Sequence, residues 1–118
     1  EHYSGDFPLW LSPKQVIIIP ISVKFNNYAL SICKKLQENN IRVELDLRSE
    51  KVGSKIRNAE INKIPIMIIL GEKEMKNKSI SVRRRFKGDL GTMKLNKFVS
   101  KILDEIINKG EKNSNKKI

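Results

Sequence analysis

The stretch Q-V-I-I-I-P-I, residues 15–21, decides the fold class of this 118-residue chain. Four β-branched apolar residues follow one another from Val16 to Ile19, so neither face of the strand is polar. Such a run is typical of a strand that is buried on both sides in a parallel sheet. Pro65 opens a second run of this kind, I-M-I-I-L at residues 66–70. Since parallel strands need long crossover connections, usually helices, we expect an α/β fold.

The segments around these two strands have helical or strand-like periodicity. Apolar residues recur at three- and four-residue steps in three predicted helices, residues 26–40, 52–63 and 94–109. Residues 42–47 alternate and predict a further strand, and residues 71–78 predict a turn into an antiparallel strand that begins at Ser79. Gly110 is expected to end the last helix. The predicted order is β-α-β-α-β-β-α, a mixed sheet of four or five strands with three helices.

Charge is the strongest compositional signal. Lysine and arginine number 24 against 13 aspartate and glutamate residues, which gives a net charge of +11. This excess favours a polyanionic partner, either nucleic acid or an acidic membrane face.

The residues that usually carry catalysis or metal binding are scarce. The single cysteine, Cys33, fits a helix core, and the only histidine, His2, has no neighbouring ligand set. The sequence contains no glycine-rich phosphate loop, nucleophile elbow or apolar run long enough to span a membrane. An independent small enzyme is therefore disfavoured, and we expect a cytoplasmic protein without a disulfide.

Three consecutive arginines lie on the strand that begins at Ser79. If Ile80 and Val82 face the core, Arg83 points away from it, since side chains alternate along a strand. A guanidinium held on a rigid strand can recognise phosphates and base edges with fixed, bidentate geometry. A solvated basic hairpin remains the alternative.

Polar residues also follow two of the predicted strands, at residues 46–57 and 71–74. Ligands of open α/β sheets usually bind outside the carboxyl ends of parallel strands, so these segments and the arginine strand can border one surface. An acidic residue on such a basic surface repels phosphate, but it can accept a hydrogen bond from a base amino or imino group. The arrangement therefore favours base reading, with solvated charged side chains as the alternative.

Four pieces of the sequence resemble the C-terminal anticodon-binding domain of the threonyl-tRNA synthetases, which are class II aminoacyl-tRNA synthetases. They are F-P-L-W-L-S-P-K-Q-V at 7–16, D-L-R-S-E-K-V-G-S-K-I-R at 46–57, P-I-M-I-I-L-G-E-K-E at 65–74 and S-V-R-R-R-F-K-G-D-L-G-T-M at 81–93. The second piece and the G-x-K-E ending of the third recur in related synthetases, whereas the first and the last are closer to the threonyl group. The resemblance covers the chain apart from its basic tail.

This resemblance implies a mixed five-stranded sheet with three helices, with the fifth strand near residues 88–93. It also implies recognition of the threonine anticodon, chiefly its second and third bases, G and U, by the tRNA-binding residues Ser49, Glu74 and Arg83, of which Glu74 and Arg83 match the base-reading residues of the family. Ser49 stands where the family often has asparagine, and Phe86 stands where a small residue is common, so both roles stay open. The residues expected to support the RNA contact are Arg48, Lys51 and Lys73.

The resemblance further implies a division of the chain. Residues 1–14 are expected to connect to a preceding catalytic domain, residues 15–110 to form the anticodon-binding domain, and residues 111–118 to form a basic tail. ATP, magnesium and zinc are expected in the catalytic domain, and no catalytic residue or cofactor in this chain. The full-length ligase is expected to be a homodimer and the separate domain a monomer. The alternatives are a dimerisation or protein-interaction module of the same fold, using the apolar residues within 7–11, and the anticodon domain of a related class II synthetase.

Overall fold

The computed structural model describes residue 9, residues 12–85 and residues 87–116, with side chains up to residue 107. In this part of the chain, five strands form one sheet in the order β2-β1-β3-β4-β5. The elements, in chain order, are β1 (Val16–Pro20), the 3-10 helix η2 (Val23–Phe25), α1 (Asn26–Glu38), β2 (Val43–Leu45), α2 (Val52–Ile61), β3 (Ile66–Leu70), α3 (Glu72–Asn77), β4 (Ser79–Arg84), β5 (Gly88–Lys94) and α4 (Leu95–Lys116).

The sheet is mixed, as the sequence predicts. Strand β1 pairs in parallel with β2 and with β3, and β4 pairs antiparallel with β3 and β5. The parallel strands β1, β2 and β3 all end at the same edge of the sheet, so the loops that follow them lie together. This edge and the antiparallel β4–β5 hairpin hold the residues of the candidate site.

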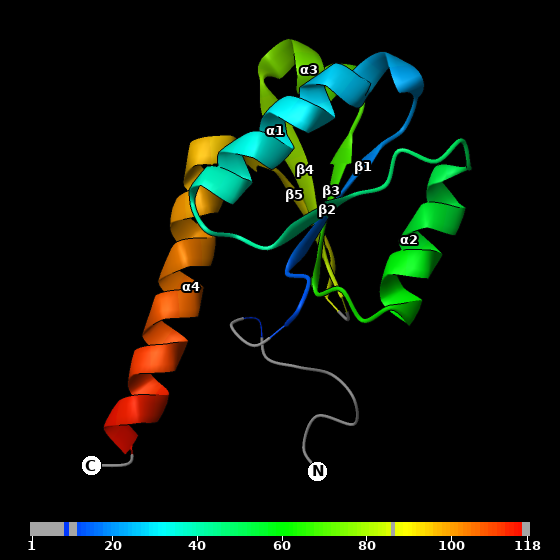
Figure 1. Cartoon of the computed structure of the whole chain (residues 1–118). Coiled ribbons are helices and arrows are strands. Elements are labelled where there is room, and N and C mark those ends of the chain that lie inside the picture. The colour runs from blue at the N-terminus through cyan, green and yellow to red at the C-terminus, as the bar shows by residue number, and fades with distance from the viewer. Residues whose placement is uncertain (1–8, 10–11, 86, 117–118) are drawn as a thin grey trace.

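Helices cover the two faces of the sheet unequally (Figure 1). Helices α1 and α4 pack on one face, where Ile18, Ile68 and Phe98 belong to the larger core cluster. Helix α2 packs on the other face, where Ile17 and Met67 belong to the smaller cluster. Alternate residues of β1 and β3 thus enter opposite cores, which is why both strands are continuous apolar runs.

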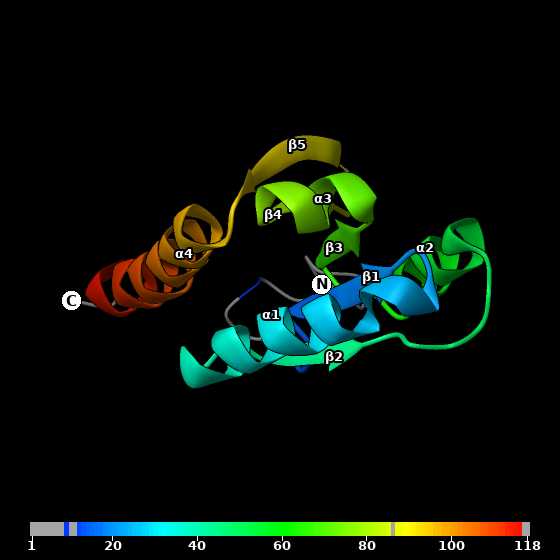
Figure 2. The ribbon, with the colours of Figure 1, turned by 90° about the horizontal axis from the view of Figure 1, so that it is seen from above.

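Among the described residues, no helix covers part of the α2 face of the sheet. Figure 2 shows α2 beside β1, with β4 and β5 extending the sheet past β3 on the side away from β2. The smaller core cluster contains residues of β1, α2 and β3 but none of β4 or β5 among the described residues. Ser81 and Thr92 pair across β4 and β5 on this face; Ser81 is half-buried and Thr92 is exposed. We call this the open face of the β4–β5 hairpin.

The structure differs from the sequence-based expectation in two elements. Residues 72–77 form a short helix, α3, instead of a turn, so the described residues contain four α-helices. Helix α4 continues past Gly110 to Lys116, so the predicted stop at Gly110 is wrong. An isolated glycine costs a helix only about 1 kcal/mol relative to alanine and does not have to end it.

The predicted connector is only partly described. Leu9 is 3% exposed and belongs to the larger core cluster, and the Gln15 side-chain amide donates to its carbonyl oxygen at 3.0 Å. Phe7, Trp10, Leu11 and Phe86 lie outside the described residues.

Candidate nucleic-acid interface

Two adjacent arginines of β4 point to opposite faces of the sheet. Arg84 lies on the α4 side, where its guanidinium makes a bidentate ion pair with Glu105; the Nη1–Oε1 distance is 2.8 Å and the second bond joins Nη2 to Oε2. Hydrogen bonding to Glu105 raises the pKa of Arg84 above its ordinary value. Arg84 is therefore committed to holding α4 against the sheet.

Arg83 has the opposite surroundings. It pairs with Met67 across β3 and β4, which places it on the open face, as the alternation of Ile80 and Val82 predicts. Its side chain is half-buried and makes no hydrogen bond or ion pair with any other described residue. A half-buried guanidinium without a protein acceptor keeps its full donor set for a ligand.

Glu74 lies in the first turn of α3, after the carboxyl end of β3. Its Oε1 accepts a hydrogen bond from the Gly71 N–H at 2.8 Å, and its second oxygen has no partner among the described residues. Burial raises the pKa of Tyr28, and the negative charge of Glu74 raises it further. The Tyr28 hydroxyl donates to the Ser79 carbonyl oxygen at 2.8 Å. The carboxylate therefore combines a structural role with one free acceptor oxygen.

Glu74 and Arg83 are not in contact with each other. Glu74 lies near the start of β4, and Arg83 follows Ser79 by four residues, which is about 13 Å along a strand. Both side chains are half-buried, so neither is sealed inside the protein.

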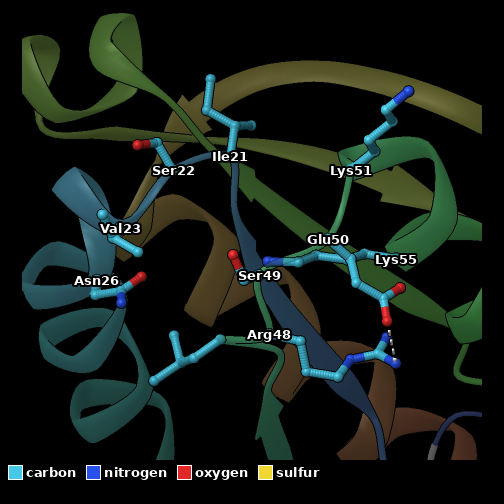
Figure 3. Close-up of a pocket in the computed structure, with 10 residues that line it drawn as sticks. Ile21, Ser22, Val23, Asn26, Arg48, Ser49, Glu50, Lys51 and Lys55 are labelled. Atoms are coloured by element: carbon cyan, nitrogen blue, oxygen red, sulfur yellow. Dashed lines mark ion pairs between the residues drawn. The ribbon is translucent and has the colours of Figure 1, made fainter.

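A cavity of about 390 Å³ opens at the carboxyl ends of β1 and β2 (Figure 3). It brings together Arg48, Ser49 and Lys51, three of the residues that the sequence nominates. Its other lining residues come from the loop after β1, the start of α1, the loop after β2 and α2: Ile21, Ser22, Val23, Asn26, Leu47, Glu50 and Lys55. We call it the loop pocket.

The loop pocket is partly apolar at its surface. Ile21, Val23 and Leu47 are 47%, 72% and 38% exposed, although they are large hydrophobic residues. An exposed apolar group beside polar and cationic side chains is suited to the flat, apolar face of a nucleobase. Nothing in the sequence pattern marks these three residues as site residues, although Ile21 and Val23 lie within three residues of Pro20, where β1 ends.

Arg48 is largely occupied by other parts of the protein. Its Nε and Nη2 atoms each donate to the carboxylate of Asp46 at 2.8 Å, and Nη1 lies 3.5 Å from Glu50. These hydrogen bonds hold the pKa of the buried Asp46 carboxyl below its ordinary value. Arg48 therefore braces the loop that carries Ser49, and it has less donor capacity left for RNA than the sequence suggested.

The remaining nominated residues are exposed. Ser49 and Lys51 lie on the rim of the loop pocket, and Lys73 lies on α3 beside Glu74. Neither lysine forms an ion pair with another described residue, so both ammonium groups can approach a phosphate backbone.

Lys55 is a residue of the pocket that sequence reasoning missed. It is 4% exposed, and its ammonium donates to the carbonyl oxygens of Asp46 at 3.1 Å and Pro20 at 3.4 Å. One signal was available, because Lys55 precedes Ala59 by four residues and so shares the inner face of α2. A lysine on that face is unusual and needs polar partners.

Two features are absent from the described residues. No group of three or more histidine, cysteine, aspartate or glutamate side chains there is arranged to hold a metal ion. Among the same residues, no helix is both long and apolar enough to cross a membrane.

Comparison with known proteins gives a consistent result. The family model described as "Anticodon binding domain" matches residues 15–105. The chain is 51% identical over 109 residues to a threonine–tRNA ligase of Acetivibrio thermocellus; the matched region covers 92% of this chain and 17% of the relative. It is 54% identical over 106 residues to the threonine–tRNA ligase of Clostridioides difficile, with 90% of this chain and 17% of the relative covered.

A solved structure agrees with these relatives. The RNA-binding domain of threonyl-tRNA synthetase from Cryptosporidium parvum matches with a TM-score of 0.84 and 28% identity, over 88% of this chain and 26% of that one. The chain thus spans about 17% of the length of the curated relatives that it matches. By fold, by family model and by sequence, the chain belongs to the anticodon-binding domain family.

Proposed function

We propose that this domain recognises the anticodon of threonine tRNA as part of a longer threonine–tRNA ligase, which attaches threonine to its tRNA with ATP. The observation that carries the proposal is the contrast between two neighbouring arginines: Arg84 is held by Glu105, whereas Arg83 lies on the open face and its side chain has no acceptor among the described residues. The net charge of +11 and the names of the curated relatives support the same conclusion.

In this proposal, unpaired anticodon bases splay onto the carboxyl edge of the sheet and the open face. Arg83 donates to a base carbonyl oxygen, and the free oxygen of Glu74 accepts from a base amino or imino group. Because Glu74 lies near the start of β4 and Arg83 lies about 13 Å along that strand from Ser79, an RNA that uses both side chains must extend along β4.

The loop pocket takes a second base. Ile21, Val23 and Leu47 offer an apolar surface to the ring, and Ser49 offers a hydroxyl that both donates and accepts. Lys51 and Lys73 hold the phosphate backbone and supply affinity without sequence preference.

The rest of the ligase lies outside this chain. We assign the ATP, magnesium and zinc sites to its catalytic part, and we expect the full-length enzyme to be a cytoplasmic homodimer. The separate domain is expected to be a monomer.

The test is binding of RNA stem-loops to Arg83→Ala. Fluorescence anisotropy is measured with a stem-loop that carries the threonine anticodon and with one that carries an unrelated anticodon. The substitution should cost about 1–3 kcal/mol with the threonine stem-loop and reduce the preference between the two RNAs.

Lys34→Ala is the matched control, because Lys34 is an exposed cation on α1 that does not line the loop pocket. It should leave the preference unchanged. If the unaltered domain bound both stem-loops equally at physiological salt, anticodon reading by this domain would be excluded.

A further inference from the structure

The loop pocket contains a buried cation with an unused donor. The Lys55 side chain reaches from α2 toward the middle of the lining residues, beside Ser49 in the view of Figure 3. An ammonium group has three N–H donors. Two of them meet the carbonyl oxygens of Asp46 and Pro20, and no third acceptor exists among the described residues.

Burying this charge is costly unless its hydrogen bonds are made. The two carbonyl groups follow β2 and end β1, so Lys55 joins the two strand ends that form the pocket. The Asp46 carboxylate compensates part of the charge, since Lys55 contributes to lowering the Asp46 pKa. The ammonium is thus fixed in position, with one N–H left over.

Lys55 differs from the other polar groups of the pocket. The Ser49 hydroxyl both donates and accepts, so it does not discriminate between a base carbonyl and a base amino group. Arg48 is held by Asp46, and Lys51 is exposed and has no side-chain partner among the described residues. Lys55 alone among these four residues is buried, fixed and able only to donate.

We propose that Lys55 is a specificity-determining residue, whose third N–H donates to a carbonyl oxygen of the base in the loop pocket. Guanine and uracil carry a carbonyl oxygen where adenine and cytosine carry an amino group. A donor-only ammonium binds the first pair and leaves the amino group of the second unpaired. The pocket therefore selects keto bases over amino bases. This inference rests on the proposed function, since it requires that an anticodon base enters the pocket.

The experiment combines a change in the RNA with a change in the protein. The RNA is the threonine anticodon stem-loop, in which guanine is replaced by 2-aminopurine, or uracil by 2-pyrimidinone. Each replacement deletes one carbonyl oxygen and also the neighbouring ring N–H, so the contribution of the oxygen is taken from the difference between the two proteins. The proteins are the unaltered domain and Lys55→Met, which keeps the length of the side chain but cannot donate. Affinities are measured by fluorescence anisotropy, and folding is checked by circular dichroism.

We expect deletion of the carbonyl at one anticodon position to weaken binding to the unaltered domain by roughly tenfold. The same deletion should weaken binding to Lys55→Met less than about twofold, because the donor is already gone. Lys51→Met is the matched control: it should weaken all RNAs alike and keep the tenfold sensitivity to the carbonyl.

A second variant covers the case in which Lys55→Met does not fold. Lys55→Gln can still donate to the two strand-end carbonyls, and its own oxygen can accept from an amino group. It should bring the affinities for uracil- and cytosine-containing stem-loops closer together. An NMR measurement needs no variant: the native stem-loop should shift the Lys55 ε-methylene signal more than the carbonyl-deleted one.

Three results would overturn the inference. Equal sensitivity to carbonyl deletion in the unaltered domain and in Lys55→Met would make Lys55 a structural clamp only. No sensitivity in the unaltered domain, with the threonine anticodon still preferred, would exclude a keto-selective pocket while leaving the proposed function intact. Loss of affinity for every RNA with a flatter salt dependence in Lys55→Met would indicate a phosphate contact instead. Equal binding of all anticodon stem-loops by the unaltered domain, in contrast, would contradict the proposed function itself.

Discussion

At the scale of single residues, the neighbouring Arg83 and Arg84 have different surroundings. Alternation along β4 predicts the direction of Arg83 from the apolar residues beside it. The partner of Arg84 was not predictable in the same way, because Glu105 lies 21 residues away on another element. The two adjacent arginines allow stability and RNA binding to be measured separately.

We expect Arg84→Ala to lower the free energy of unfolding by about 1–3 kcal/mol, since it removes the bidentate ion pair between α4 and the sheet that the half-buried Glu105 carboxylate makes with Arg84. Arg83→Ala should change it by less than about 0.5 kcal/mol, because Arg83 has no partner among the described residues. Urea unfolding measures both values. A loss of stability in Arg83→Ala as large as in Arg84→Ala would mean that Arg83 is part of the folded scaffold.

The Asp46 carboxylate, which accepts hydrogen bonds from Arg48 beside the loop pocket, makes the stability of the domain sensitive to acid. Its pKa is lowered in the folded protein from an ordinary value of 3.8, mainly by the side-chain hydrogen bonds from Arg48. The unfolded chain therefore takes up the proton first as the pH falls, so this stabilisation is complete well above pH 3.8 and is lost as the pH falls toward the lower folded value. Stability measured by urea unfolding against pH should fall over this range. Asp46→Asn should be less stable at neutral pH and show a flatter acid limb; an unchanged limb would show that other carboxylates cause the fall.

At the scale of elements, the apolar patterns of the sequence predicted the buried strands and helices. They did not predict an element that has no buried apolar face. Strands β1 and β3 were predicted from their continuous apolar runs. Helix α3 was not, because its six residues, E-K-E-M-K-N, include none that is buried. The helix exists because Glu74 accepts from the Gly71 N–H and Lys78 adopts a left-handed conformation at its end, with φ of 51°.

The double role of Glu74 in α3 can be separated by two substitutions. Glu74→Ala removes both the cap and the free acceptor, so we expect about 1 kcal/mol lower stability together with weaker RNA binding. Glu74→Gln keeps an oxygen for the Gly71 N–H but puts an amide donor where the free oxygen was. It should retain stability within about 0.5 kcal/mol and still lose preference for the threonine anticodon. Full RNA preference in Glu74→Gln would restrict Glu74 to capping.

At the scale of the whole molecule, the asymmetric covering of the sheet by helices leaves exposed the surface that we propose for RNA binding. Helix α2 covers β1 and β3 on its face and leaves β4 and β5 open, while the carboxyl ends of the parallel strands supply the loop pocket. The sequence indicated that these regions border one surface, because parallel strands end together. The buried ammonium of Lys55 was not predictable, since its contacts depend on how α2 packs against the ends of β1 and β2.

A salt titration should distinguish two contributions to RNA affinity: that of the lysines that contact phosphate, and that of the residues proposed to contact bases. Each phosphate that a lysine neutralises adds roughly 0.7–0.9 to the slope of log affinity against log salt, whatever the RNA sequence. We therefore expect Lys51→Ala and Lys73→Ala each to reduce that slope by about this amount for threonine and unrelated stem-loops alike. Arg83→Ala should alter the ratio of the two affinities at every salt concentration, because a base contact contributes sequence information and a phosphate contact does not. Anisotropy titrations between low and physiological salt give both quantities from the same data. If either lysine substitution changed the anticodon ratio, that lysine would have to be reassigned from the backbone to a base.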